Sequence, residues 1–106
     1  MNIQKMMQQA QEMQTKLQDM QETIGQEEVV GSAGGGVVKI TMTCKGHVSK
    51  VEIDPDSMNP DEKEIVEDLV AAACNDARAK ADEKMAEETK RMMEELGLPA
   101  GMQLPF

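Results

Sequence analysis

The feature that most constrains this chain is a heptad repeat of apolar residues near its beginning. The apolar positions are separated alternately by three and four residues, which places them on one narrow stripe of a helix. They are Ile3, Met6, Ala10, Met13, Leu17, Met20 and Ile24. The residues between them are mostly glutamine, which favours helix without adding charge, and Gly25 follows where a C-cap is expected. We predict a helix over about residues 2–24, whose apolar stripe is a helix–helix or dimer seam.

The middle of the chain has the alternating pattern of a small antiparallel sheet. Apolar and β-branched residues predict strands over about 27–32, 37–44 and 47–54, with the loop GSAGGG between the first two. The last two strands flank Lys45-Gly46, which we interpret as a two-residue hairpin turn. Positions 44/47, 42/49, 40/51 and 38/53 then face each other, and one face of the hairpin is largely apolar. In this register Lys39 lies opposite Glu52, where an ordinary ion pair is expected.

The segment Asn59-Pro60-Asp61-Glu62 carries the signals of a helix start. It offers a capping residue, a proline for the first helical position and a capping-box glutamate. Apolar and small residues recur beyond it until Gly97 and Pro99 interrupt the pattern. We predict a second helix over about 60–96, followed by an irregular tail over 97–106.

The element order is therefore α-β-β-β-α, an α+β fold that we expect to form a single domain over residues 1–106. At about 1.5 Å per residue the second helix is about 55 Å long, whereas a compact domain of this size has a radius of gyration of about 13 Å. Large side chains are scarce, because the chain has no tryptophan or tyrosine and only one phenylalanine. We therefore expect a projecting helix and a homodimer, in which a second chain adds buried surface.

Several classes of protein are excluded by what the sequence lacks. No apolar run is long enough to span a membrane, and the first residues lack the apolar core of a signal peptide, so we expect a cytoplasmic protein. Cys44 and Cys74 would be reduced in that compartment. We interpret them as buried small apolar residues and not as a disulfide or a metal pair.

Signatures of an enzyme are equally weak. The single histidine, His47, adjoins a turn and has no partners for a nucleophilic triad. The GSAGGG loop lacks the Gly-Lys-Ser/Thr that follows a phosphate-binding loop. Glu52, Asp54 and Asp56 have the alternation of a calcium loop, but the glycine and the final glutamate of such a loop are missing. We expect no catalytic activity, no metal and no cofactor.

The charge is distributed unevenly along the chain. The formal net charge is −9, yet residues 29–51 contain no acid. One explanation is that the lysines of this stretch are ordinary solvated surface. The other is that they contact phosphates of DNA, because charges more than roughly 8 Å apart are screened and a local basic zone survives an acidic total. The candidate DNA contacts are Lys39, Lys45 and Lys50 in this stretch, and Arg78, Lys80 and Lys84 on the second helix.

Several longer stretches resemble the YbaB/EbfC family of bacterial nucleoid-associated DNA-binding proteins. They are MMQQAQEMQTKLQDMQ, VVGSAGGGVVKITM, VEIDP, EIVEDLVAAACNDARAKADE and the ending GMQLPF, and together they cover nearly the whole chain. The resemblance implies an α-β-β-β-α fold, an intertwined homodimer with projecting helices like tweezers, and binding of double-stranded DNA on the cytoplasmic nucleoid. It assigns no DNA contact to a single position.

A different class of function also fits the sequence. Methionine-rich helices on an acidic body suit a prefoldin-like holdase, which grips apolar segments of client proteins, or a protein–protein adaptor. The gripping residues would be Met6, Met7, Met13, Met20, Met85, Met92 and Met93. Salt separates the two classes, because phosphate contacts weaken steeply as salt rises and apolar contacts do not.

Overall fold

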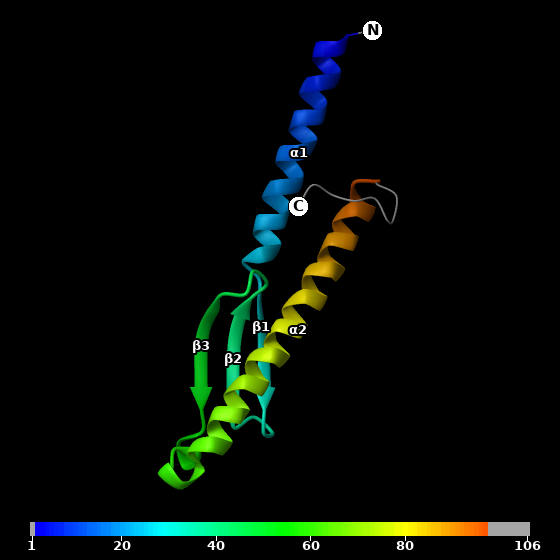
Figure 1. The fold of residues 1–106 in the computed structure, drawn as a ribbon. Helices are drawn as coiled ribbons and strands as arrows, with labels where there is room; N and C mark the ends of the chain where they lie inside the picture. The colour runs from blue at the N-terminus through cyan, green and yellow to red at the C-terminus, as the bar shows by residue number, and fades with distance from the viewer. Residues whose placement is uncertain (1, 98–106) are drawn as a thin grey trace.

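The computed structural model describes residues 2–97, which form two long helices and a three-stranded antiparallel sheet of order β1-β2-β3 (Figure 1). The elements are α1 (Ile3–Gly25), β1 (Glu28–Ala33), β2 (Val38–Thr43), β3 (Val48–Ile53), the 3₁₀ turns Pro55–Ser57 and Pro60–Glu62, and α2 (Lys63–Glu95). The expected α-β-β-β-α order and α+β class are confirmed. The predicted tail lies, beyond Gly97, outside the described residues. Within residues 2–97 no helix is both long and apolar enough to cross a membrane.

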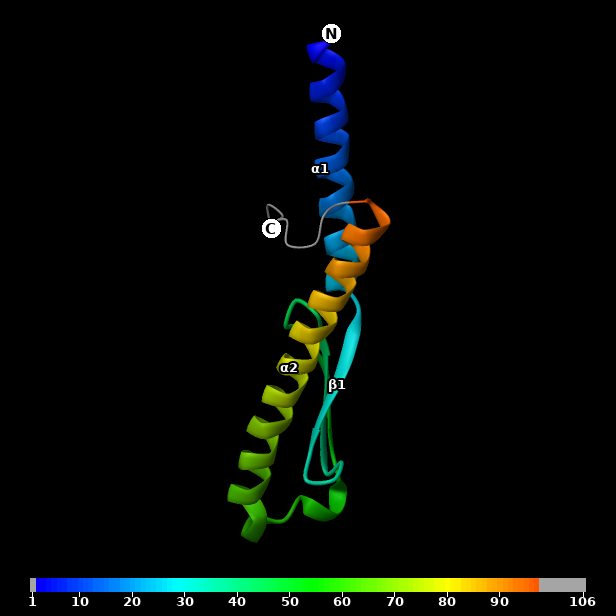
Figure 2. The same ribbon diagram turned by 90° about the vertical axis from the view of Figure 1, so that its right-hand side faces the viewer.

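The main core lies between α2 and one face of the sheet. Alternation along β2 buries Val38, Ile40 and Met42 on this inner face, where they pack against alanines spaced four residues apart on α2. Those alanines are Ala73, Ala77 and Ala81, each fully buried. The helix lies mainly over β1 and β2 (Figure 2), and Ile53 is the residue of β3 that packs against this core.

The register of the second hairpin agrees with the prediction at one end and differs at the other. Val38 faces Ile53 and Ile40 faces Val51, as expected. A shift between Thr41 and Met42 then pairs Met42 with Val48 in place of residue 49. The predicted two-residue turn is therefore wrong, and a longer turn is closed by the Thr43 backbone N–H, which donates to the His47 carbonyl at 2.8 Å.

Side chains explain why the turn is longer than expected. The Thr43 hydroxyl accepts a hydrogen bond from the His47 N–H at 3.1 Å, which stabilises the wider turn. Ser49, the extra residue of a β-bulge, donates its hydroxyl to the Thr41 carbonyl and to the Glu28 carboxylate. Ser49 thus leaves the apolar face to which the simple register assigned it.

The ends of the helices correct two further expectations. Gly25 is the last residue of α1 and has no positive φ, so it is not the predicted left-handed C-cap. The Lys45 stem crosses the helix end, where a Cβ on Gly25 would lie 2.5 Å from its Cε, so a larger residue there displaces the lysine side chain. At the other helix, Asn59 caps a 3₁₀ turn by accepting from the Asp61 N–H, and α2 begins only at Lys63.

The heptad stripe of α1, called the α1 seam below, is covered over only part of its length. Its C-terminal residues Leu17 and Ile24 are buried against Met92 of α2, and Met20 packs beside them. Its N-terminal residues stay exposed: Ile3, Met6, Ala10 and Met13. This half of α1 projects away from the sheet, and the molecule extends over 74 × 21 × 16 Å (Figure 1).

Candidate nucleic-acid interface

The six candidate DNA contacts do not form one patch in a single chain. Lys39 and Lys50 lie on the outer face of the sheet, which is the face turned away from α2. Lys45 and Arg78 lie at the tip of the β2–β3 hairpin. Lys80 and Lys84 lie along the edge of β1 that does not pair with β2. Each surface presents a different electrostatic environment.

The outer sheet face carries two lysines around the Glu52 carboxylate, and Glu28 adds a second carboxylate beside Ser49. Lys50 Nζ lies 2.8 Å from Glu52 Oε1 on the same strand. The hydrogen bond and the charge of this pair raise the pKa of Lys50 and lower the pKa of Glu52. Lys39 faces Glu52 across the strands as predicted, but the expected ion pair is wrong, since Glu52 pairs with Lys50. Among the described residues Lys39 has no ion-pair partner, so its charge is available to a ligand.

At the hairpin tip, close packing holds both cations. The Lys45 stem lies against Gly25, and its Nζ is 4.0 Å from Glu22 Oε1, a loose contact between exposed groups. The Arg78 guanidinium lies beside Gly46, where a Cβ would come within 2.8 Å of Nη1. Arg78 is held by Asp82, one turn later in α2, at 3.2 Å. The tip therefore combines two cations with two acids and is close to neutral.

At the β1 edge, Lys80 and Asp76 have a structural role, because both bind the backbone of β1. Lys80 Nζ donates to the Val30 carbonyl at 3.1 Å and pairs with Asp76 Oδ2 at 2.9 Å. Asp76 Oδ2 in turn accepts from the Ser32 backbone N–H at 3.0 Å. These bonds satisfy backbone groups of β1 that face away from β2. Lys84 lies 3.8 Å from Glu27, so both lysines of this edge are engaged with the protein itself.

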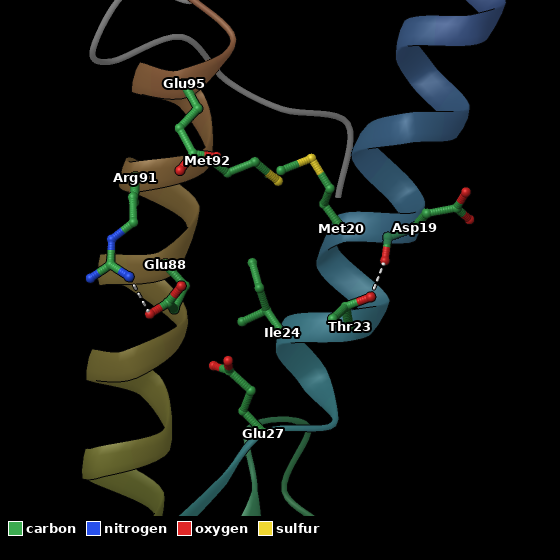
Figure 3. A pocket seen from close by; sticks show the side chains of 9 residues that line it. All are labelled: Asp19, Met20, Thr23, Ile24, Glu27, Glu88, Arg91, Met92 and Glu95. Carbon is green, nitrogen blue, oxygen red and sulfur yellow. Dashed lines mark hydrogen bonds and ion pairs between the residues drawn. The ribbon is translucent and has the colours of Figure 1, made fainter.

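An acidic groove separates α1 from α2 above the sheet (Figure 3). Its volume is about 360 Å³, and Met20 of α1 and Met92 of α2 point toward each other across it. Its lining residues are Asp19, Met20, Thr23, Ile24, Glu27, Glu88, Arg91, Met92 and Glu95. The only cation in this lining, Arg91, pairs with Glu88 at 3.2 Å. The charge of the groove is therefore unfavourable for phosphate.

The projecting half of α1 is a surface that our charge reasoning passed over. Before Asp19 the chain holds only three charged residues, Lys5, Glu12 and Lys16. The α1 seam exposes 67% of Ile3 and 58% of Met6 on this stretch. The signal was present in the sequence as a glutamine-rich, nearly acid-free helix. A projecting helix was expected, but which part of which helix projects was not predictable, because it depends on how far up α1 the helix α2 reaches.

The cysteines and the acidic side chains of residues 2–97 form no metal centre. Cys44 and Cys74 are free thiols, and burial raises the pKa of Cys44. Within this part of the chain no group of three or more His, Cys, Asp or Glu side chains is arranged to hold a metal ion. Asp54 instead caps a 3₁₀ turn by accepting from the Asp56 N–H at 3.0 Å.

Comparison with known proteins gives one consistent family. The model of the YbaB/EbfC DNA-binding family matches residues 1–96. Two relatives named nucleoid-associated protein, from Beijerinckia indica and Brucella ovis, are 54% and 48% identical over 101 residues, covering 95% of this chain and 94% of each relative. An uncharacterized Helicobacter pylori protein of known crystal structure shares the fold, with a TM-score of 0.69, 18% identity, and coverage of 88% of this chain and 98% of that one. Since the family model and the relatives span almost the whole sequence, the chain belongs to the YbaB/EbfC DNA-binding family.

Proposed function

We propose that this protein is a nucleoid-associated protein that binds duplex DNA as a homodimer, mainly through phosphates, and thereby organises the nucleoid or modulates gene expression. The names of its relatives support the association with the nucleoid. The single observation that carries the DNA surface is the outer sheet face, where the uncovered Lys39 has no acid partner among the described residues. The proposed activity is binding without catalysis.

Contact with phosphates, rather than with bases, follows from the side chains on this face. Lys39 lies opposite Ser32 and Lys50 lies opposite Thr41, and their hydroxyls are groups that bind phosphate oxygens. Residues 2–97 contain no Phe, Tyr or Trp side chain to stack on a base. We therefore expect little preference for sequence.

Three features support the homodimer. The main core of one chain is small, because α2 contributes alanines to it. On the inner face of β3, Val51 is 51% exposed. The upper α1 seam also lacks a partner within residues 2–97. A second chain that covers any of these surfaces buries apolar area at roughly 25 cal/mol per Å².

The test is fluorescence anisotropy of a labelled random-sequence duplex, titrated between about 50 and about 200 mM salt. If Lys39, Lys45 and Lys50 of both chains contact phosphate, about six counterions are released and log K falls against log salt with a slope of roughly −5. The double variant Lys39→Gln/Lys45→Gln removes four contacts per dimer and reduces the slope to roughly −2.

A matched control removes the same charge elsewhere. Lys63→Gln/Lys90→Gln also neutralises two exposed lysines per chain, both on α2 and far from the outer sheet face. We expect its slope to equal that of the wild type. If both double variants bind equally well, DNA binding stands and the assigned surface is wrong. If the wild type does not bind at about 50 mM salt, the DNA function itself is wrong for this chain.

The exposed α1 seam favours one alternative function, the holdase or adaptor. Met6, Met7 and Met13 present thioethers to solvent on the projecting helix, as a client-binding surface requires. This alternative predicts that the protein suppresses aggregation of a heat-unfolded client equally at low and high salt. Met6→Gln/Met13→Gln abolishes that suppression and leaves DNA binding unchanged.

A further inference from the structure

The rest of the chain covers one edge of the sheet and leaves the other edge open. The edge of β1 is closed, because Asp76 and Lys80 of α2 bind the Ser32 N–H and the Val30 carbonyl. The edge of β3 receives no comparable cover among the described residues, and α2 packs elsewhere. An open strand edge is a template for pairing with another chain, so proteins either protect it or use it. Here one edge is protected and the other is not.

The direction of the β3 backbone groups can be read from its pairing. The Asp54 N–H donates to the Val37 carbonyl at 2.8 Å, so residues 54, 52 and 50 bond toward β2. By the alternation of an antiparallel ladder, Val51 and Ile53 then direct their N–H and C=O groups outward. The Val51 side chain is 51% exposed on the inner face, beside the part of β3 that α2 leaves bare.

We propose that β3 is the strand through which two copies of this chain pair, antiparallel and in register about Val51. The inference rests on the proposed homodimer and names its joining surface. With Val51 on the twofold axis, the two Val51 residues exchange both backbone hydrogen bonds and pack side by side on the inner face.

The same register makes the outer face self-complementary in charge. Lys50 of each copy lies opposite Glu52 of the other, on the non-hydrogen-bonded positions where side chains approach most closely. Each Glu52 already binds Lys50 of its own strand at 2.8 Å. The twofold therefore completes a square of alternating charges. A shift that places Lys50 on the axis instead sets two lysines against each other and is disfavoured.

This pairing also joins the two outer sheet faces into one surface. Lys39 and Lys50 from both copies then lie near the axis around two Glu52 carboxylates, giving that centre a net charge of +2. A single chain presents half of this zone beside an acidic body. The dimer thus assembles the phosphate-binding surface out of two incomplete halves.

Disulfide cross-linking tests the register directly. In a Cys44→Ala/Cys74→Ala background, the additional Val51→Cys substitution places two thiols across the axis, at a Cα separation of about 5.5 Å that a disulfide bridges. Val30→Cys is the matched control, because Val30 is 48% exposed on the opposite strand, whose edge α2 closes. We expect covalent dimers at Val51 within minutes of mild oxidation and little product at Val30.

Light scattering of the reduced background protein separates the two ways of failing. A dimer that does not cross-link at Val51, or that cross-links equally at Val30, overturns the β3 interface and leaves the homodimer intact. A monomer at all concentrations overturns the proposed homodimer itself.

A charge swap provides a second, independent test of the register. Lys50→Glu or Glu52→Lys alone sets like charges against each other twice across the axis and raises the dimer Kd about tenfold. The combined variant Lys50→Glu/Glu52→Lys restores the alternation, and we expect a Kd within about twofold of the wild type. Single variants that dimerise like the wild type, or a combined variant no better than either, overturn the register.

Discussion

Gly31 allows β1 to pack directly against the backbone of α2, because it has no Cβ. A Cβ at this residue would collide with the backbone nitrogen of Ala77 and the carbonyl oxygen of Ala73. Since neither contact is a flexible side chain, Gly31→Ala must push the helix away from the sheet. We expect a loss of about 2 kcal/mol in the free energy of unfolding, measured by urea denaturation followed by circular dichroism.

The control for Gly31 is Gly35, which has open space around it but a φ of +70°. Gly35→Ala should lower the free energy of unfolding only through its unfavourable backbone conformation, by about 1 kcal/mol. A Gly31→Ala variant no less stable than Gly35→Ala would show that helix and strand can separate without cost.

The stability that Asp76 contributes at the closed edge of β1 depends on pH. The Ser32 N–H, and then the Lys80 ammonium, lower the pKa of this carboxyl below its ordinary value. A carboxyl whose pKa is lowered by folding stabilises the protein above its unfolded pKa, about 3.9, and loses this contribution as pH falls through the folded pKa. Asp76→Asn should therefore be less stable than the wild type near pH 7, and the difference should shrink toward about pH 3. Urea midpoints at both pH values measure it.

Asp68→Asn serves as the control for this titration. Asp68 lies on the same helix and makes no ion pair within the described residues. Because Asp68 lacks such a partner, its substitution should change the midpoint near pH 7 less than Asp76→Asn does. A difference for Asp76→Asn that is independent of pH would mean that the carboxylate charge plays no part in closing the edge.

At the scale of elements, α1 is held by a small cluster, separate from the core over the sheet. Met92, 2% exposed, fills the space between Leu17 and Ile24. Met92→Ala leaves a cavity there, and we expect α1 to detach locally while the sheet remains folded. Hydrogen exchange in residues 17–25 should become at least about tenfold faster, whereas the exchange rate in β2 should not change.

Met7→Ala is the matched control for this element, because Met7 is 60% exposed on the projecting half of α1. It removes the same side chain without opening a cavity, so protection of residues 17–25 should not change. If Met92→Ala also accelerates exchange in β2, then α1 and the sheet unfold as one cooperative unit.

The sequence predicts these elements well because their signals are local. The heptad spacing of α1 and the alternation of apolar residues along β2 both act within a few residues. The turn of the second hairpin was mispredicted because Ser49 finds partners on β1, 21 residues away at Glu28. The role of Lys80 was missed for a similar reason, since its acceptor is the distant Val30 carbonyl. Charge alone identifies candidate residues, but only the tertiary structure shows which of them are already engaged.

At the scale of the whole molecule, a small basic zone must act against a large acidic body. The net charge is −9 per chain, and the molecule is 74 Å long. The screening length is about 30 Å at 0.01 M salt and about 8 Å at 0.15 M. At very low salt a DNA duplex on the outer sheet face is therefore repelled by acids over much of the protein. At physiological salt it interacts only with the charges nearest to it.

We therefore predict that DNA affinity passes through a maximum as salt is raised. Below about 50 mM, added salt screens the acidic body and strengthens binding, whereas above it the release of counterions from phosphate weakens binding. Anisotropy titrations from about 5 to about 300 mM salt measure the curve. Neutralising distant acids with Glu88→Gln/Glu95→Gln, both in the acidic groove, should move the maximum to lower salt and leave the high-salt slope unchanged. An affinity that falls steadily over the whole range, in both proteins, would mean that the acidic body does not oppose DNA at the bound position.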